Sequence, residues 1–114
     1  MIRVASISQI PVGEARHFEV EGEEIVIVNA GAYLYAISDV CSHEYFHLSD
    51  GEVDLDTTTI ECPKHGSTFD LASGRPLSLP AVLPVRTYGV KLVGEDVMVD
   101  VLEPASDNVA PAGV

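Results

Sequence analysis

Both cysteines of the chain stand close to a histidine. One residue separates Cys41 from His43 and two separate Cys62 from His65, which gives a C-x-H pair and a C-x-x-H pair with residues 44–61 between them. A Pro within the second pair and a Gly directly after it indicate a loop. Thiolates and imidazoles are metal ligands, so two loops could deliver two of each to one centre. The pattern predicts a metal centre with Cys41, His43, Cys62 and His65 as its ligands.

The mixed pairs separate three interpretations of this quartet. Structural zinc sites usually pair like with like, as C-x2–4-C and H-x3–5-H, whereas each motif here combines one Cys with one His. A [2Fe–2S] cluster with two Cys on one iron and two His on the other suits mixed pairs, because each loop can serve both irons. Two buried cysteines beside incidental histidines would leave the short offsets unexplained. We predict one [2Fe–2S] cluster per chain, with zinc as the main alternative.

Further motifs extend the pattern over roughly residues 2–102. They read C-S-H at 41–43, L-S-D-G at 48–51, C-P-K-H-G-S-T-F-D at 62–70, S-G at 73–74, L-P-A at 79–81 and P-V-R-T-Y at 84–88. Together they resemble the Rieske family, and especially the small Rieske-type ferredoxins of bacterial dioxygenases that hydroxylate aromatic rings of the biphenyl or carbazole kind. The resemblance implies the iron–sulfur cluster, the four ligands above and a role in electron transfer.

The expected surroundings of the cluster differ from those of high-potential Rieske proteins. The resemblance places Phe46 and Lys64 where those proteins have a disulfide, and Ser67 and Phe69 where they have Ser and Tyr hydroxyl donors. Two neutral imidazoles in place of two thiolates put Rieske potentials between about −150 and +300 mV. Without the disulfide and the Tyr donor we expect the low end of this range, with Ser67 raising the potential slightly.

The remaining histidines, His17 and His47, allow a second kind of site to be considered. A mononuclear oxygen-activating iron uses two His and a carboxylate, which these histidines and an Asp could supply. His17 and His47 are far apart in the sequence and belong to no matching motif, so we predict that they are surface or packing residues. On this interpretation the chain cannot activate oxygen itself, and it is a carrier rather than an enzyme.

Composition predicts a small, acidic, single-domain protein. The chain has 114 residues, 46% of them hydrophobic, and no apolar run approaches the about 20 residues of a membrane span. No signal peptide is evident, and the metal-site spacing of the cysteines indicates a reducing cytoplasm. Eighteen acidic against six basic residues give a net charge of −12, which disfavours nucleic acid and anionic membranes. The charge could serve solubility alone or docking on positively charged partners.

The fold is predicted to be all-β, an antiparallel β-sandwich with a cluster-binding subdomain of two ligand loops. Alternation such as Val97, Val99 and Val101 around polar neighbours indicates strands, which we expect at 2–6, 15–20, 24–29, 33–38, 58–61, 68–71, 85–93 and 97–102. Pro80 and Pro84 resemble the third loop that covers Rieske clusters, or else only interrupt the chain before a strand. Residues 1–102 are expected to form the Rieske domain and 103–114 a flexible tail rich in Pro, Ala and Gly.

These features favour a monomeric one-electron carrier. It would accept electrons from a ferredoxin reductase and pass them to the terminal oxygenase of an aromatic-ring-hydroxylating dioxygenase by transient electrostatic docking. One alternative is the small Rieske subunit of an assimilatory nitrite reductase. The alternative outside redox chemistry is a zinc-stabilised interaction module.

Overall fold

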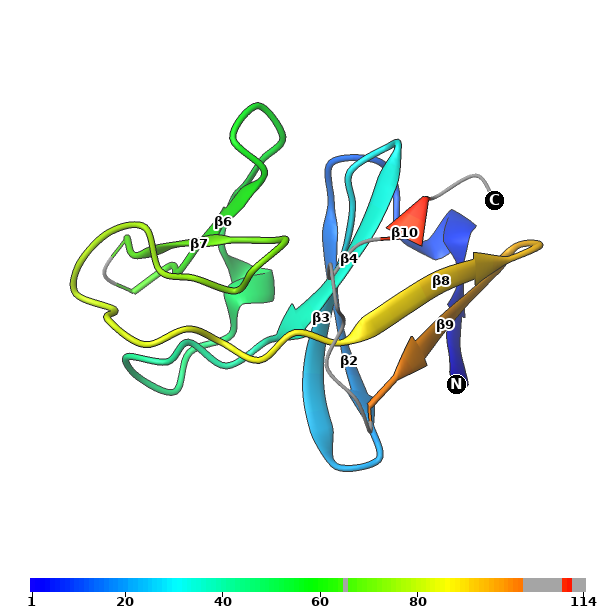
Figure 1. The fold of residues 1–114 in the computed structure, drawn as a ribbon, viewed down its shortest axis with the longest axis horizontal. Coiled ribbons are helices and arrows are strands. Elements are labelled where there is room, and N and C mark those ends of the chain that lie inside the picture. The colour runs from blue at the N-terminus through cyan, green and yellow to red at the C-terminus, as the bar shows by residue number, and fades with distance from the viewer. Residues whose placement is uncertain (65, 102–109, 112–114) are drawn as a thin grey trace.

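The computed structural model describes residues 1–64, 66–101 and the backbone of 110–111, and strands dominate it (Figure 1). The strands are β1 Ile2–Ser6, β2 Ala15–Val20, β3 Glu23–Asn29, β4 Tyr33–Ser38, β5 Val53–Asp54, β6 Thr59–Glu61, β7 Thr68–Asp70, β8 Gly89–Val93, β9 Asp96–Asp100 and β10 Ala110–Pro111. Two short 3-10 helices are added, η1 Ile7–Gln9 and η2 Leu48–Asp50. The predicted all-β class is confirmed.

The strands form three antiparallel sheets. Their strand orders are β1-β9-β8, β10-β4-β3-β2 and β5-β6-β7. In Figure 1 the first two sheets face each other as a sandwich, and the small third sheet lies beside it with the loops that precede and follow its strands. The molecule therefore consists of a base sandwich and a lobe that carries both predicted ligand loops.

Strand β3 supplies side chains to two hydrophobic cores. Ile25 and Ile27 pack inside the sandwich, whereas Val26 and Val28 pack against the lobe, and all four side chains are fully buried. Successive side chains of a strand point to opposite faces, so the apolar run 25–28 fits a strand covered on both sides. Each such burial stabilises the fold by roughly 1.5–3 kcal/mol. The core on the lobe side contains Cys41 and Cys62, so β3 helps to anchor the predicted site.

The sequence predicted most strands within two residues but misplaced one boundary. Residues 85–88 were expected in a strand, yet β8 begins at Gly89. This segment still runs along β4, since Ser38 N–H donates to Arg86 O (2.8 Å) and Tyr88 N–H donates to Ala36 O (2.9 Å). Pro84 precedes it and the pairing is intermittent, so no regular ladder forms. The short β5, η1 and η2 were not predicted, because elements of two or three residues have no measurable periodicity.

Most of the predicted flexible tail, 103–114, lies outside the described residues. Within it, Ala110 and Pro111 form β10 and pair with Leu34 and Tyr33 at the edge of β4. Among the described residues, no helix is long and apolar enough to cross a membrane.

Tyr88 gives the fold a measurable pH response. Its side chain is buried, and burial, followed by the hydrogen bond that its hydroxyl donates to Glu23 (3.1 Å), raises the pKa of Tyr88 to about 12. Tyr in the unfolded chain ionises near pH 10, so between about pH 10 and 12 the unfolded state binds fewer protons than the folded state. The stability that this group contributes should be fully present below pH 10 and lost as the pH rises toward 12. Denaturant titrations of wild type and Tyr88→Phe across this range should diverge; parallel curves would contradict the assignment.

Candidate cluster site

The two predicted ligand loops have the same backbone closure. Cys41 N–H donates to Phe46 O (3.0 Å) and Cys62 N–H donates to Ser67 O (2.7 Å), so each loop closes onto the fifth residue after its cysteine. Antiparallel pairing continues below each closure, as an isolated bridge between Val40 and His47 in the first loop and as strands β6 and β7 in the second. Each cysteine therefore sits at the point where a rigid antiparallel pair opens into a loop.

The second loop depends on a glycine. Gly66 has φ +76°, a left-handed conformation that side chains other than glycine adopt at a cost. Its N–H donates to Cys62 O (3.1 Å), which turns the chain back toward β7.

A third loop, residues 77–84, is tied to both ligand loops. Ser42 Oγ donates to Leu83 O (2.5 Å), and Ala81 N–H donates to Ser67 Oγ (3.1 Å). These bonds support the interpretation that residues 77–84 form the third loop, which covers the cluster in Rieske proteins. A segment that only interrupted the chain before a strand would need neither hydrogen bond. Four apolar side chains of the segment remain exposed: Leu77, Leu79, Val82 and Leu83. The three loops gather at the end of the molecule opposite the β8–β9 turn (Figure 1).

The predicted ligands differ in exposure. Cys41 and Cys62 are buried, 4% and 2% exposed, and neither takes part in a disulfide. His43 is exposed at the surface of the first loop. The fourth predicted ligand, His65, lies outside the described residues. Sulfur donors inside and an imidazole outside suit a centre whose Cys-bound iron is buried and whose His-bound iron faces the solvent.

The positions that match a disulfide in high-potential Rieske proteins hold a different contact. The Lys64 Nζ lies 5.3 Å from the centroid of the Phe46 ring, in the range of a cation–π interaction. The contact links the two ligand loops without a covalent bond. It was not foreseen from the sequence, where Phe46 and Lys64 indicated only that a disulfide is impossible.

Comparison with known proteins gives the family. The profile of the Rieske [2Fe-2S] domain matches residues 1–89. The chain belongs to the Rieske [2Fe–2S] domain family. It is 37% identical over 100 residues to the ferredoxin component of biphenyl 2,3-dioxygenase from Rhodococcus jostii, covering 88% of this chain and 92% of the relative.

Two solved structures of ferredoxins agree with this Rieske assignment. The ferredoxin of carbazole 1,9a-dioxygenase from Nocardioides aromaticivorans superposes with a TM-score of 0.83 at 41% identity, covering 86% of this chain and 94% of that one. A ferredoxin in complex with the oxygenase of carbazole 1,9a-dioxygenase gives 0.79 at 31% identity, with 86% and 90% coverage. A protein described as a nitrite reductase small subunit shares 20% identity, a likeness that shows the fold alone.

The donor set of this Rieske chain fits the cofactor of its family. Two buried thiols outside any disulfide, one on each of two matched loops, can provide the Cys ligands of a [2Fe–2S] centre, and His43 stands beside the first. The family carries a [2Fe–2S] cluster. The predicted cofactor is therefore confirmed, and structural zinc is set aside as the occupant of this site.

The structure brings together two histidines that no sequence motif pairs. His17 and His47 were predicted to be surface or packing residues, and their rings stack with centroids 4.8 Å apart. Asp39, which the sequence did not single out, lies with them, and its carboxylate accepts a hydrogen bond from His17 Nδ1–H. The proximity of His17 and Asp39 follows from the pairing registers of the strands, which were not predicted from the sequence. His17 lies opposite Val26, Val26 lies opposite Ile37, and Asp39 follows Ile37 by two residues on the same face.

Proposed function

We propose that this chain is a ferredoxin that passes single electrons from a ferredoxin reductase to the terminal oxygenase of an aromatic-ring-hydroxylating dioxygenase. The observation that carries the proposal is its likeness, at 37–41% identity over nearly their whole length, to proteins named as ferredoxin components of such systems. Ferredoxin components carry electrons and are not the catalytic subunits. We therefore assign the chain no reaction of its own.

We assign the cluster ligands to Cys41 and Cys62 on one iron and to His43 and His65 on the other. The assignment is supported by the matched closure of the two loops, the burial of both thiols and the exposure of His43. The bound cluster supplies one-electron redox chemistry at a potential that the two neutral imidazoles raise above that of four-Cys clusters. The chain excludes water from the thiolates and leaves the His43 side of the site open to a partner. Because a reducing compartment keeps cysteines available to iron, we place the carrier in the cytoplasm.

The oxygenase is the better supported of the two proposed partners. One of the similar structures is a ferredoxin bound to the oxygenase of carbazole 1,9a-dioxygenase. The reductase follows from chemistry, since a one-electron carrier needs a donor. The nitrite reductase alternative rests on a likeness in fold only, at 20% identity.

Electron transfer in stopped flow tests the proposed function. The reduced, cluster-loaded protein is mixed without oxygen with the oxidised oxygenase of the biphenyl or carbazole system, and its visible absorbance is followed. We expect rapid reoxidation by at least one of them and separation from it on a sizing column, as for a transient carrier. Failure to reduce either oxygenase, together with stable co-elution with a nitrite reductase, would favour the subunit alternative.

The net charge of −12 predicts that docking depends on salt. Screening shortens from about 30 Å at 0.01 M ionic strength to about 8 Å at 0.15 M, and steering can raise association rates by about tenfold or more. The transfer rate should therefore fall as salt is added. Glu44, exposed next to His43, should matter most: Glu44→Lys should slow transfer at low salt and flatten the salt dependence, while the visible spectrum stays unchanged.

Glu95 provides the matched control for this charge reversal. It is exposed in the β8–β9 turn, at the end of the molecule opposite the ligand loops (Figure 1). Glu95→Lys changes the net charge by the same amount, so a local docking effect should leave this variant close to wild type. Equal losses in both variants would indicate a general charge effect. No salt response in wild type would indicate apolar docking, for which Leu79→Ser and Val82→Ser are the next variants.

A further inference from the structure

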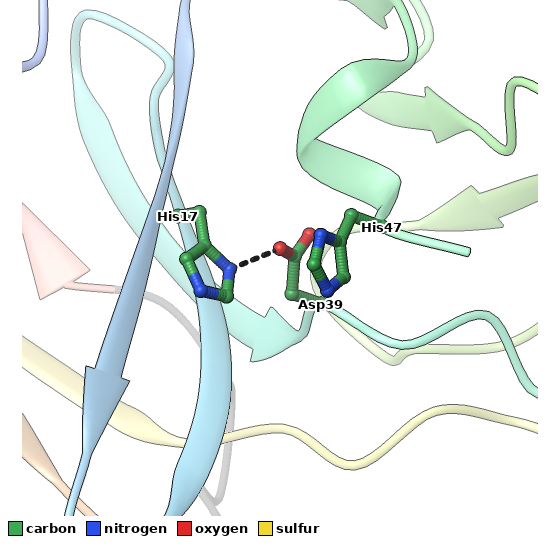
Figure 2. Close-up of side chains that lie close together, drawn as sticks. All are labelled: His17, Asp39 and His47. Carbon is green, nitrogen blue, oxygen red and sulfur yellow. Dashed lines mark hydrogen bonds and ion pairs between the residues drawn. The ribbon is translucent and has the colours of Figure 1, made fainter. Parts of the chain in front are cut away.

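Two histidines and a buried carboxylate form a cluster outside the iron–sulfur site. His17 comes from β2, Asp39 follows β4, and His47 follows the first ligand loop. Figure 2 shows the three side chains gathered together, with the Asp39 carboxylate directed at a ring nitrogen of His17. One nitrogen from each ring and one carboxylate oxygen lie within 4.8 Å of one another. Imidazole and carboxylate groups are ligands of zinc and of other divalent first-row transition metals.

Asp39 is held rigidly at the centre of this cluster. Its side chain is fully buried, and Ser49 orients it through the backbone N–H on Oδ1 (2.6 Å) and the hydroxyl on Oδ2 (2.8 Å). The third donor is His17 Nδ1–H, on Oδ2 at 2.5 Å. The two bonds from Ser49 do not depend on His17, and the proton of His17 occupies the position that a cation could take.

His47 is oriented from the opposite side. Its Nε2–H donates to Glu24 Oε1 (3.0 Å), and the Tyr45 hydroxyl lies 2.7 Å from both oxygens of Glu24. The Tyr45 hydrogen bond, more than the contacts with His47, lowers the pKa of Glu24, which keeps this carboxylate ionised. A carboxylate on one ring nitrogen fixes the tautomer and leaves Nδ1 of His47 for a metal, as in carboxylate–histidine–metal arrangements.

We propose that His17, Asp39 and His47 form a second metal site, which binds one divalent transition-metal ion of the zinc type and is separate from the iron–sulfur cluster. The ion takes the place of the proton between His17 and Asp39. Two ligands of one tetrahedral zinc ion, each at about 2.0–2.1 Å, are about 3.3 Å apart, so Nδ1 of His17 and Oδ2 of Asp39, now 2.5 Å apart, must separate by somewhat less than about 1 Å. His17 is 36% exposed and can make this adjustment, and a cation can enter from the solvent on its side.

The position of the site gives the ion a structural role. Asp39 and His47 lie on the two chain segments at the base of the first ligand loop, where Val40 lies opposite His47 and Leu48 N–H donates to Asp39 O (2.7 Å). His17 belongs to a strand of the base sandwich. One ion bound to all three side chains would fasten the loop base to the sandwich. The inference does not depend on the proposed electron-transfer partners.

Equilibrium dialysis of the cluster-loaded protein against zinc, with zinc and iron measured together, tests the site. We expect one zinc per chain with two irons retained. The X-ray absorption spectrum at the zinc edge should show only nitrogen and oxygen atoms bound to the zinc. His17→Gln and His47→Gln keep a hydrogen-bonding amide but remove a ligand. Each should weaken zinc binding by at least about tenfold, since even the loss of a group that only orients a ligand costs about 10–100-fold.

Controls separate this site from other acidic groups and from the cluster ligands. Glu19→Gln removes one exposed charge from the same strand and should leave zinc affinity unchanged, whereas Glu24→Gln should weaken it through His47. The proposal is overturned if the protein retains no zinc or if zinc binds only as iron is lost. It is also overturned if the X-ray absorption spectrum shows a sulfur atom bound to the zinc. Unchanged affinity in both histidine variants overturns it as well. If a variant loses its iron and fails to fold, the zinc X-ray absorption spectrum of the wild type still shows whether the zinc is bound by nitrogen and oxygen ligands or by sulfur.

Discussion

Cys41→Ser and Cys62→Ser should each abolish the iron–sulfur centre and much of the stability of the domain. Both thiols lie in the core on the lobe side, among side chains such as Leu48, Ile60 and Phe69. A bound centre stabilises only the folded state, so its loss removes binding free energy that belongs to folding. The loss should be comparable with the total stability of a domain, about 5–15 kcal/mol. Iron content and the electron paramagnetic resonance spectrum after dithionite measure the loss of the centre, and thermal unfolding measures the loss of stability.

A comparison of apo proteins isolates the contribution of the cluster to stability. A serine hydroxyl in place of a buried thiol also costs about 1–3 kcal/mol if it finds no partner. The two variants should therefore be less stable than the wild type without iron by no more than this amount, whereas the loaded wild type should exceed all three by considerably more. Ser67→Ala serves as the matched control, because it also changes a buried polar group of the second loop but should keep two irons. Two irons and an unaltered spectrum in either cysteine variant would remove that cysteine from the ligand set.

The ligand loops were predictable because their signal is local. A C-x-H and a C-x-x-H motif bring sulfur and nitrogen donors together whatever the rest of the chain does. The strands around them were also predictable, since alternation such as Val97, Val99 and Val101 records one buried face, and these positions are indeed buried in β9 and just after it.

Contacts between distant segments could not be obtained in this way. His17, Asp39 and His47 meet because the registers of β2 with β3 and of β3 with β4 place them on one face. The sequence indicated the strands but not the registers, and a shift of one residue would turn every side chain to the other face. The approach of Lys64 to Phe46 depends likewise on how two loops fold toward each other. Such contacts follow from tertiary packing, which no motif in this chain encodes.

The surroundings of Ser67 bear on the potential of the bound cluster. Ser67 is 1% exposed, and its Oγ accepts the N–H of Ala81 at 3.1 Å. A hydroxyl that accepts one hydrogen bond retains its own proton for donation. Because Ser67 is buried in the second ligand loop and its carbonyl accepts the N–H of Cys62, a cysteine or cluster sulfur is a suitable acceptor for that proton.

Ser67→Ala should lower the midpoint potential of the cluster. A hydrogen bond to sulfur stabilises the more negative reduced state more than the oxidised state, so removing the donor disfavours reduction. A differential effect of about 1.4 kcal/mol corresponds to about 60 mV for a one-electron couple, and we expect a decrease of this order. Phe69→Tyr should act in the opposite direction, because it adds a hydroxyl where the resemblance places the Tyr donor of high-potential Rieske proteins, in the core that contains both cysteines. Protein-film voltammetry of the two variants and the wild type measures both shifts; potentials within a few millivolts of wild type would show that neither side chain is directed at the cluster.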